Sequence, residues 1–306
     1  MKRIAFVVVL VLIILLSGCS RNSTETPRSS SRPKVTTTIG MIGDIALNLA
    51  GDYAEVTSLM GPGVDPHLYK ATASDVKILS ESDLILYGGL HLEGKMGDVL
   101  KSLSRTKKTV AVSESIPKEN LIGLGDSYDP HVWFDINLWL YAVKAAYDSL
   151  VELIPERATE ITENYNRYVE QLHALDEFIR EEVAKLDAEQ RVLITAHDAF
   201  EYFGKAYGFE VKGLQGISTV SEAGTRNVQD LANYIVEHQI KAVFIETSVP
   251  KKTIYSLQQA VKAKGFAVEI GGELFSDAMG DSGTKEGTYQ GMLEHNITTI
   301  VAALAL

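Results

Sequence analysis

Three of the seven histidines stand beside a carboxylate in a loop, a combination that suits metal binding. The tripeptide Asp-Pro-His occurs twice, ending at His67 and at His131, and His197 is followed directly by Asp198. Imidazole nitrogen is a common ligand for zinc and related transition metals. A single histidine is more often a surface or core residue than a metal ligand. Because the tripeptide occurs twice, metal binding and a structural role are about equally favoured for these histidines. Both interpretations stay open on these residues alone.

The carboxylates next to these histidines are the expected partners of their rings. A ligating imidazole usually donates its second ring N–H to a carboxylate, which fixes the tautomer. Asp65, Asp129 and Asp198 are therefore the candidates for orienting the three rings, although adjacency in the sequence does not establish that geometry. Proline restricts its own φ and biases the preceding residue to an extended conformation, so the two Asp-Pro-His loops should be stiff. The four remaining histidines, on helical stretches, are interpreted as structural or solvated: His91, His173, His238 and His295.

Two acidic residues follow predicted strands and are candidates for the same site. Asp277 comes after a strand and a Gly-Gly pair at 271–272, which permits a tight loop. Glu246 ends another strand and is interpreted either as an orienting carboxylate or, slightly favoured, as a salt-bridge partner. Ligands of open α/β sheets bind at the carboxyl ends of the strands, where His67, His197 and Asp277 all fall.

Short β-branched runs alternate with helical periods from residue 34 onward, which predicts right-handed βαβ units and mostly parallel sheets. The first series has strands at 35–39, 54–60, 83–87 and 109–112, and helices at 42–50, 74–80, 92–103 and 137–153. The second has strands at 191–195, 209–214, 242–245 and 267–270, and helices at 199–207, 228–238, 254–264 and 289–304. The fold class expected is therefore α/β, with two doubly wound α/β domains.

A long amphipathic segment separates the two series. Its apolar residues recur at spacings of three and four between 161 and 186, and Pro155 is tolerated in a first helical turn. Such a helix of about 30 residues is about 45 Å long, enough to run along both domains. The expected boundaries are 34–154 for the N-terminal domain, 155–187 for the connecting helix and 188–306 for the C-terminal domain.

The first 33 residues predict an export signal and a tether. Residues 4–16 are an unbroken apolar run of about 20 Å as a helix, shorter than a bilayer core of about 30 Å. Residues 1–18 are therefore interpreted as a lipoprotein signal peptide. Leu-Ser-Gly-Cys ends at Cys19, the only cysteine, and resembles the bacterial lipobox, in which this cysteine is lipidated. Residues 19–33, rich in Ser, Thr and Pro, are expected to be a disordered tether; an ordinary secretory signal with an incidental cysteine is the alternative.

The composition excludes several classes of function. The chain has 29 Lys and Arg against 40 Asp and Glu, a net charge of −11, whereas a nucleic-acid partner requires a basic surface. A single cysteine excludes an intramolecular disulfide framework and any multi-cysteine zinc or iron–sulfur site. The sequence contains no HExxH, no phosphate-binding GKS/T loop and no GxGxxG turn after a strand.

Taken together and in order, the motifs resemble those of the cluster A-I (cluster 9) solute-binding lipoproteins of metal-ion ABC importers, in particular the TroA-like zinc/manganese binders. The motifs that carry the resemblance are the lipobox, GPGVDPHLYKATASDV, SDLILYGGLHLE, DPHVWFD, TAHDAFEYFGKAYGFE and GGELFSDAMG followed by GTY. The resemblance covers residues 34–306 and implies two α/β domains joined by one long rigid helix, with one divalent metal in the cleft between them. The ligands that it implies are His67, His131, His197 and Asp277.

The resemblance also implies a cargo and partners. The transported ion would be Zn²⁺ or Mn²⁺, with Fe²⁺ less favoured. The third ligand position is Glu in many manganese-specific members and His in zinc or mixed members, as in His197 here. Residues 113–128 lack the histidine-rich loop of many zinc-specific members, which weakens a zinc-only assignment. The implied partners are the importer permease with its ATPase, and the membrane through the lipid anchor on its extracytoplasmic face. We expect a monomer that binds no nucleic acid and is not an enzyme.

Two other functions stay open. An exported zinc hydrolase is one, because sites with three histidines are also catalytic. Four protein ligands would leave that metal no position for water, however, and no motif supplies a general base. A surface adhesin is the other, because some relatives have been described as adhesins, although nothing in the sequence points to a protein partner beyond the importer.

Overall fold

Four parallel strands form the sheet of the first half, as the alternating pattern predicts. In the computed structural model, which describes residues 32–305, the strand order is β2-β1-β3-β4. The strands are β1 (Lys34–Thr37), β2 (Glu55–Ser58), β3 (Leu84–Tyr87) and β4 (Lys108–Ala111). The helices of this half are α2 (Gly40–Ala50), α3 (Ala73–Glu81), α4 (Gly97–Leu103) and α5 (Ile136–Leu153). Parallel pairing of β1 with β2 and β3 brings the carboxyl ends of these strands to one edge.

The second half repeats the arrangement with two parallel pairs. β7 (Val192–His197) pairs with β8 (Glu210–Gln215), and β9 (Ala242–Glu246) pairs with β10 (Glu269–Leu274). β7 also lies beside β9, which brings the ends of these two strands together. The helices are α7 (Glu201–Tyr207), α8 (Thr225–Glu237), α9 (Lys252–Ala263) and α10 (Tyr289–Leu304). Every residue of β9 is buried, as expected of a strand covered on both faces.

Short elements complete the fold. A small antiparallel hairpin is formed by β5 (Gly123–Leu124) and β6 (Ser127–Tyr128). The 3₁₀ turns are η1 (Gly51–Tyr53), η2 (Val112–Ser115), η3 (Lys118–Asn120), η4 (Val132–Phe134), η5 (Pro155–Arg157) and η6 (Ala188–Gln190).

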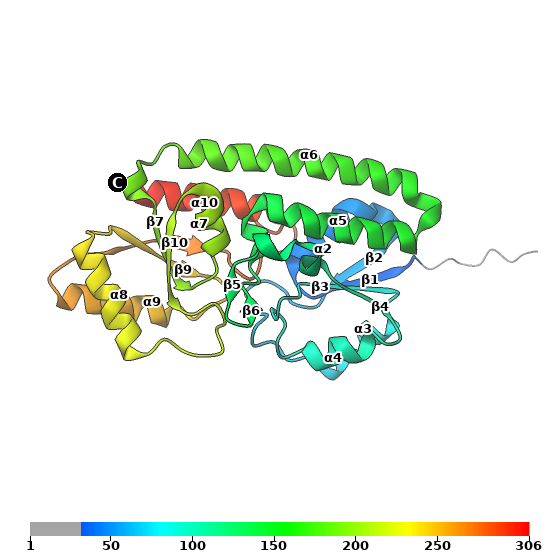
Figure 1. The fold of residues 1–306 in the computed structure, drawn as a ribbon, viewed down its shortest axis with the longest axis horizontal. Helices are drawn as coiled ribbons and strands as arrows, with labels where there is room; N and C mark the ends of the chain where they lie inside the picture. The colour runs from blue at the N-terminus through cyan, green and yellow to red at the C-terminus, as the bar shows by residue number, and fades with distance from the viewer. Residues whose placement is uncertain (1–31, 306) are drawn as a thin grey trace, which may run out of the picture. The chain divides into compact units, whose positions relative to one another are not determined.

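The predicted connecting helix is present as α6 (Ala158–Val183), the long green helix of Figure 1. It packs against α2 and α5 of the first half and against α10 and α7 of the second. It is shorter than expected at both ends: Pro155 begins a 3₁₀ turn before the α-helix starts, and the α-helix ends at Val183 instead of 187. The residues of α6 that face the core are Ile161, Tyr168, Leu172, Leu175, Ile179 and Val183. One core cluster contains residues of α6 and of both halves, so α6 joins the halves by packing as well as by the chain. The exact domain boundaries stay a prediction.

A buried carboxylate ties α6 to α2. Asp44 is 7% exposed, and its Oδ2 accepts hydrogen bonds from the Tyr168 hydroxyl at 2.8 Å and from Asn48 Nδ2 at 3.1 Å. Burial raises the pKa of Asp44, although these donors counteract the shift. A polar group buried in this way is stable only while its partners remain.

Replacing Tyr168 tests this contact. We expect Tyr168→Phe to lower the free energy of unfolding by about 1–2 kcal/mol, because a donor to a buried carboxylate is lost. Urea unfolding followed by circular dichroism measures the change. Tyr165→Phe, one turn earlier on α6, is the control and should change stability by less than about 0.5 kcal/mol. Equal stability of the two variants would contradict a role for this hydrogen bond.

Two elements differ from the sequence predictions. The helix expected at 92–103 begins only at Gly97, because Glu93 accepts the N–H groups of Gly88 (2.6 Å) and Gly89 (3.2 Å) and so holds the chain in a turn. The strand expected at 267–270 continues through the glycine pair, which was predicted as a loop. Its register shifts at Gly272, where a Cβ would lie 2.4 Å from Thr299 Cγ2. Glycine is the residue that fits this close approach.

The predicted signal peptide 1–18, the predicted lipid attachment at Cys19 and nearly all of the predicted tether 19–33 lie outside the described residues. Pro33–Leu306 group into one compact unit. Within residues 32–305, no helix combines the length and the apolar character that crossing a membrane requires.

Candidate metal centre

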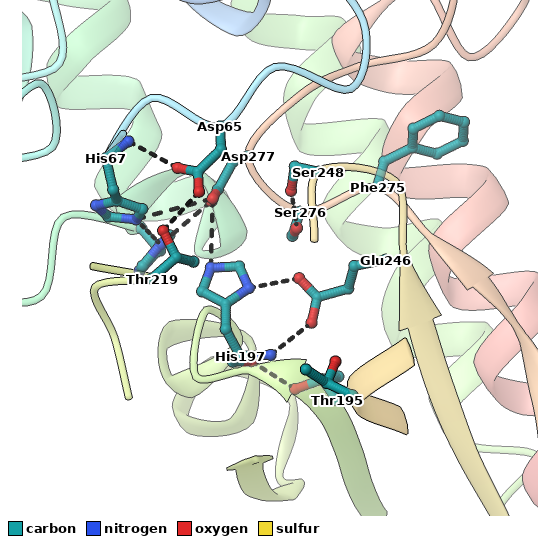
Figure 2. Close-up of polar contacts among 12 residues, drawn as sticks. Asp65, His67, Thr195, His197, Thr219, Glu246, Ser248, Phe275, Ser276 and Asp277 are labelled. Atoms are coloured by element: carbon teal, nitrogen blue, oxygen red, sulfur yellow. Dashed lines mark hydrogen bonds and ion pairs between the residues drawn. The ribbon is translucent and has the colours of Figure 1, made fainter. Parts of the chain in front are cut away.

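The structure brings the four candidate ligands together from both halves. His67 lies in the loop between β2 and α3, and His131 directly precedes η4. His197 is the last residue of β7, and Asp277 follows β10. Figure 2 shows His67 and His197 pointing toward Asp277. Each half therefore contributes two of the four side chains.

Their ligand atoms are spaced as the corners of one coordination sphere. One atom of each residue lies within 4.8 Å of the other three. His67 Nε2 and His131 Nε2 are 3.3 Å apart, and Asp277 lies 3.3 Å from His131 Nε2 through Oδ1 and 3.3 Å from His197 Nε2 through Oδ2. In a tetrahedral site with bonds of about 2.0–2.1 Å, ligand atoms are about 3.3–3.4 Å apart. In the part of the chain that the structure describes, this is the one group of three or more His, Cys, Asp or Glu residues with such spacing.

These side chains are buried, and several of their polar atoms lack hydrogen bonds. His67 is 4% exposed, Asp277 1%, and the other two histidines 0%. His197 Nε2 and both carboxylate oxygens of Asp277 make no hydrogen bond despite lying close together. Buried polar atoms without partners are costly. A cation between them would satisfy all three atoms, so the donor set fits a divalent metal.

Asp129 orients His131, as the sequence predicts. Asp129 Oδ1 lies 2.7 Å from His131 Nδ1 and also accepts the backbone N–H of His131 at 3.0 Å. In the neutral ring, this contact keeps the proton on Nδ1 and directs the lone pair of Nε2 at the other ligands. Both members of the pair are fully buried, which makes the orientation rigid.

Glu246, and not Asp198, orients His197. Glu246 Oε2 lies 2.5 Å from His197 Nδ1, and its Oε1 accepts the backbone N–H of His197 at 2.8 Å. Figure 2 shows the His197 ring between Asp277 and Glu246. The prediction that Asp198 does this is wrong, because successive side chains at the end of a strand point to opposite faces. Glu246 reaches the ring because β9 lies beside β7, so its role is the orienting one that the sequence favoured less.

Asp65 holds the loop of His67 and makes no hydrogen bond with its ring. Its Oδ1 accepts the backbone N–H of His67 at 2.8 Å, and its Oδ2 accepts the hydroxyl of Thr219 at 2.5 Å. The expected contact to the ring of His67 is therefore wrong, although the same tripeptide gives that contact at His131. Thr219 was not among the candidates, since a threonine in a loop carries no local signal for this role.

The neighbouring histidines keep the Asp277 carboxylate ionised. Burial raises the pKa of Asp277, but His197 and His131 outweigh it and hold this pKa well below its usual range. Burial lowers the pKa of His67 to about 4. Burial also lowers the pKa of His131, but Asp129 and Asp277 outweigh burial and raise this pKa to about 9. For His197, Glu246 and Asp277 likewise overcome burial and raise the pKa well above its ordinary value. A metal must therefore displace protons from His131 and His197.

Known proteins match the chain over nearly the whole described region. A family model described as ZnuA, zinc-uptake complex component A, periplasmic, matches residues 35–303. The chain is 56% identical over 278 residues to the zinc-binding protein TroA of Treponema pallidum, covering 90% of both chains. It is 50% identical over 306 residues to the manganese-binding lipoprotein MntA of Bacillus subtilis, covering 99% of this chain and 100% of that one.

Solved structures agree with the sequence comparisons. The structure of the periplasmic zinc-binding protein TroA from Treponema pallidum has a TM-score of 0.89 at 56% identity and covers 90% of this chain and 100% of its own. A Mn-bound periplasmic metal-binding protein from Candidatus Liberibacter asiaticus has a TM-score of 0.79 at 26% identity, with 89% of this chain and 100% of that chain covered.

Proposed function

Because the chain belongs to the ZnuA family of zinc-uptake components, we propose that it is the solute-binding lipoprotein of a metal ABC importer. It captures Zn²⁺ or Mn²⁺ outside the membrane and delivers the ion to the cognate permease. The observation that carries this proposal is the convergence of four buried donor residues, two from each half, at distances that fit one ion.

The proposed ligands are the Nε2 atoms of His67, His131 and His197 and the carboxylate of Asp277. Both oxygens of Asp277 face histidine nitrogens, so the site offers four or five donor atoms. Zinc accepts four-coordinate tetrahedral sites with these ligands. A bidentate carboxylate raises the coordination number, which manganese tolerates well. Both metals also occur in the names of the two relatives, since TroA is named for zinc and MntA for manganese.

Relative affinity does not identify the cargo. Zinc binds more tightly than manganese at nearly any site of nitrogen and oxygen ligands, following the Irving–Williams order. The ion that is transported then depends on which metal is available outside the cell. Both ions therefore belong to the proposal.

Retention of the ion is favoured over catalysis. A hydrolytic zinc site keeps one coordination position open to water. Here the four donor residues are at most 4% exposed, and all four of them would surround the ion from both halves. The burial supports a binding protein and not the hydrolase alternative, and the relatives named as transporter components likewise do not support an adhesin.

Location and partners follow from the same proposal. Lipidation at Cys19, which lies outside the described residues, would anchor the protein to the extracytoplasmic face of the cell membrane by residues 19–33. MntA of Bacillus subtilis is named a lipoprotein, which supports the anchor. The partners proposed are the permease and its ATPase, with residues 34–154 and 188–306 acting as the two domains of a monomer.

Metal titration tests the function. We expect the metal-free protein to retain one Zn²⁺ or one Mn²⁺ per chain after desalting, measured by elemental analysis, with zinc displacing manganese. Ca²⁺ is the control, because it prefers six to eight oxygen ligands and should not be retained. Elemental analysis of the protein from its own host identifies the physiological ion. A chain that retains neither ion, or that hydrolyses a substrate with its bound zinc, would contradict the proposal.

A further inference from the structure

One buried threonine anchors the loop between β8 and α8 to the other half of the molecule. Among residues 216–224, Thr219 is the only buried residue, at 7% exposed, whereas the next residue, Val220, is 54% exposed. The Thr219 hydroxyl donates to Asp65 Oδ2 at 2.5 Å. Thr219 follows β8 in the second half, and Asp65 precedes His67 in the first. This hydrogen bond therefore crosses between the halves beside the metal centre.

Asp65 links Thr219 to the proposed metal ligand His67. While its Oδ2 accepts from Thr219, its Oδ1 accepts the backbone N–H of His67 at 2.8 Å. Pro66, which lies between Asp65 and His67, has a restricted φ, so the short segment moves as a stiff unit. Figure 2 shows Thr219, Asp65 and His67 side by side, with the dashed lines joining them.

The other two histidines are held differently. Asp129 and Glu246 each contact both the ring and the backbone N–H of their histidine, and each belongs to the same half as that histidine. Asp65, by contrast, contacts only the backbone N–H of His67 and not its ring, and Asp65 is itself held from the opposite half. It is also the least buried of the four candidate ligands. His67 is thus the ligand whose position depends most on the two halves being together.

Two other hydrogen bonds between the halves lie in the core and have main-chain acceptors. Trp133 Nε1 donates to the carbonyl of Ser276 at 3.1 Å, and the Tyr289 hydroxyl donates to the carbonyl of Trp133 at 2.6 Å. Trp133 and Tyr289 are at most 1% exposed. These bonds persist unless the core opens, whereas the Thr219 contact is made by a loop that is otherwise exposed or half-buried.

We propose that Thr219 is a positioning residue that keeps His67 on the ion and so slows its release. This inference rests on the proposed function, because it concerns the same metal. When the Thr219–Asp65 hydrogen bond opens, the His67 loop is free to move and the ion loses its least buried ligand. Release then requires this contact to break, whereas capture begins before the contact forms and depends on it little. Differences of this kind appear mainly in dissociation rates.

Release kinetics of three variants test the proposal. The full chain is loaded with Zn²⁺, mixed with excess chelator in a stopped-flow instrument, and the release rate is measured. Thr219→Val keeps the shape of the side chain and removes the donor. We expect the ion to be released about five- to tenfold faster, which corresponds to the free energy of one hydrogen bond. Thr219→Ser restores the hydroxyl and should release within about twofold of the unaltered chain. Thr253→Val removes a hydroxyl at the start of α9 that donates to the carbonyl of Pro250, just before the helix, and should leave the rate unchanged.

The outcomes separate the positioning role from the function. If Thr219→Val binds one ion and releases it at the unaltered rate, the positioning role is rejected. If Thr219→Ser is as fast as Thr219→Val, the hydroxyl is not responsible and the proposal fails as well. If the unaltered chain retains no ion, the proposed function fails instead. Should Thr219→Val not fold, Asp65→Asn removes one acceptor of the same chain of contacts, and faster release is again expected.

Discussion

Asp277→Asn is expected to lower the affinity for Zn²⁺ roughly a hundred- to a thousandfold while the chain stays folded. Structural zinc sites with four ligands bind with about 10–16 kcal/mol, so one ligand contributes about 3 kcal/mol. The amide keeps the shape of Asp277, but it replaces one ligand oxygen by a nitrogen that cannot coordinate. It also removes the negative charge that lies 3.3 Å from His131 Nε2 and from His197 Nε2.

Competition with a chromophoric chelator measures the affinity, and circular dichroism checks the fold. Asp281→Asn, an exposed aspartate in the same loop region, removes the same charge from the chain without touching the centre. It should bind zinc as the unaltered protein does. If Asp277→Asn also binds with unaltered affinity and stoichiometry, Asp277 is not a ligand and the assignment of the centre is wrong.

Glu246→Gln is expected to lower metal affinity by about 10- to 100-fold, the usual effect of removing a partner that orients a ligand. Glu246 accepts from both the ring Nδ1 and the backbone N–H of His197. A glutamine has one acceptor oxygen, so its NH₂ group would face one of these two donors. His197 then loses its fixed tautomer or its fixed position.

Asp198→Asn is the matched comparison for Glu246→Gln. Asp198 follows His197 in the sequence, but its backbone N–H bonds to Gln215 and its side chain makes no hydrogen bond with the ring. We expect this variant to bind the metal more tightly than Glu246→Gln does, by the same competition titration. The reverse order would mean that sequence adjacency, and not the observed contact, determines which carboxylate serves His197.

The secondary structure was predictable because it depends on local periodicity. Alternating β-branched runs and helical periods identified the parallel strands and the connecting helix α6. The errors arose where specific contacts, some within a turn and some between strands, override the local periodicity. Glu93 holds a turn at a position that the periodicity assigned to a helix, and the Gly271-Gly272 pair continues β10 where the composition indicated a loop.

The four candidate ligands could also be named from the sequence, as individual candidates by residue type and as one set through the resemblance of the motifs. Their residue types, their loop positions after strands and the motifs around them are all local properties, and parallel strands bring their carboxyl ends to a common edge. The repeated tripeptide pointed correctly to Asp129 as the partner of His131. It failed at His67, where an identical tripeptide makes a different set of hydrogen bonds.

What required the folded arrangement is which groups hold each ligand in place. Glu246 lies 49 residues from His197, and Thr219 lies 154 residues from Asp65. Such contacts depend on which strands are neighbours and on how the two halves meet, and no local periodicity encodes either. Residue chemistry thus made the three histidines candidates, and the resemblance of the motifs implied the full set of three histidines and an aspartate. Only the packing of β9 beside β7, and of the Thr219 loop against the His67 loop, shows how that centre is oriented and closed.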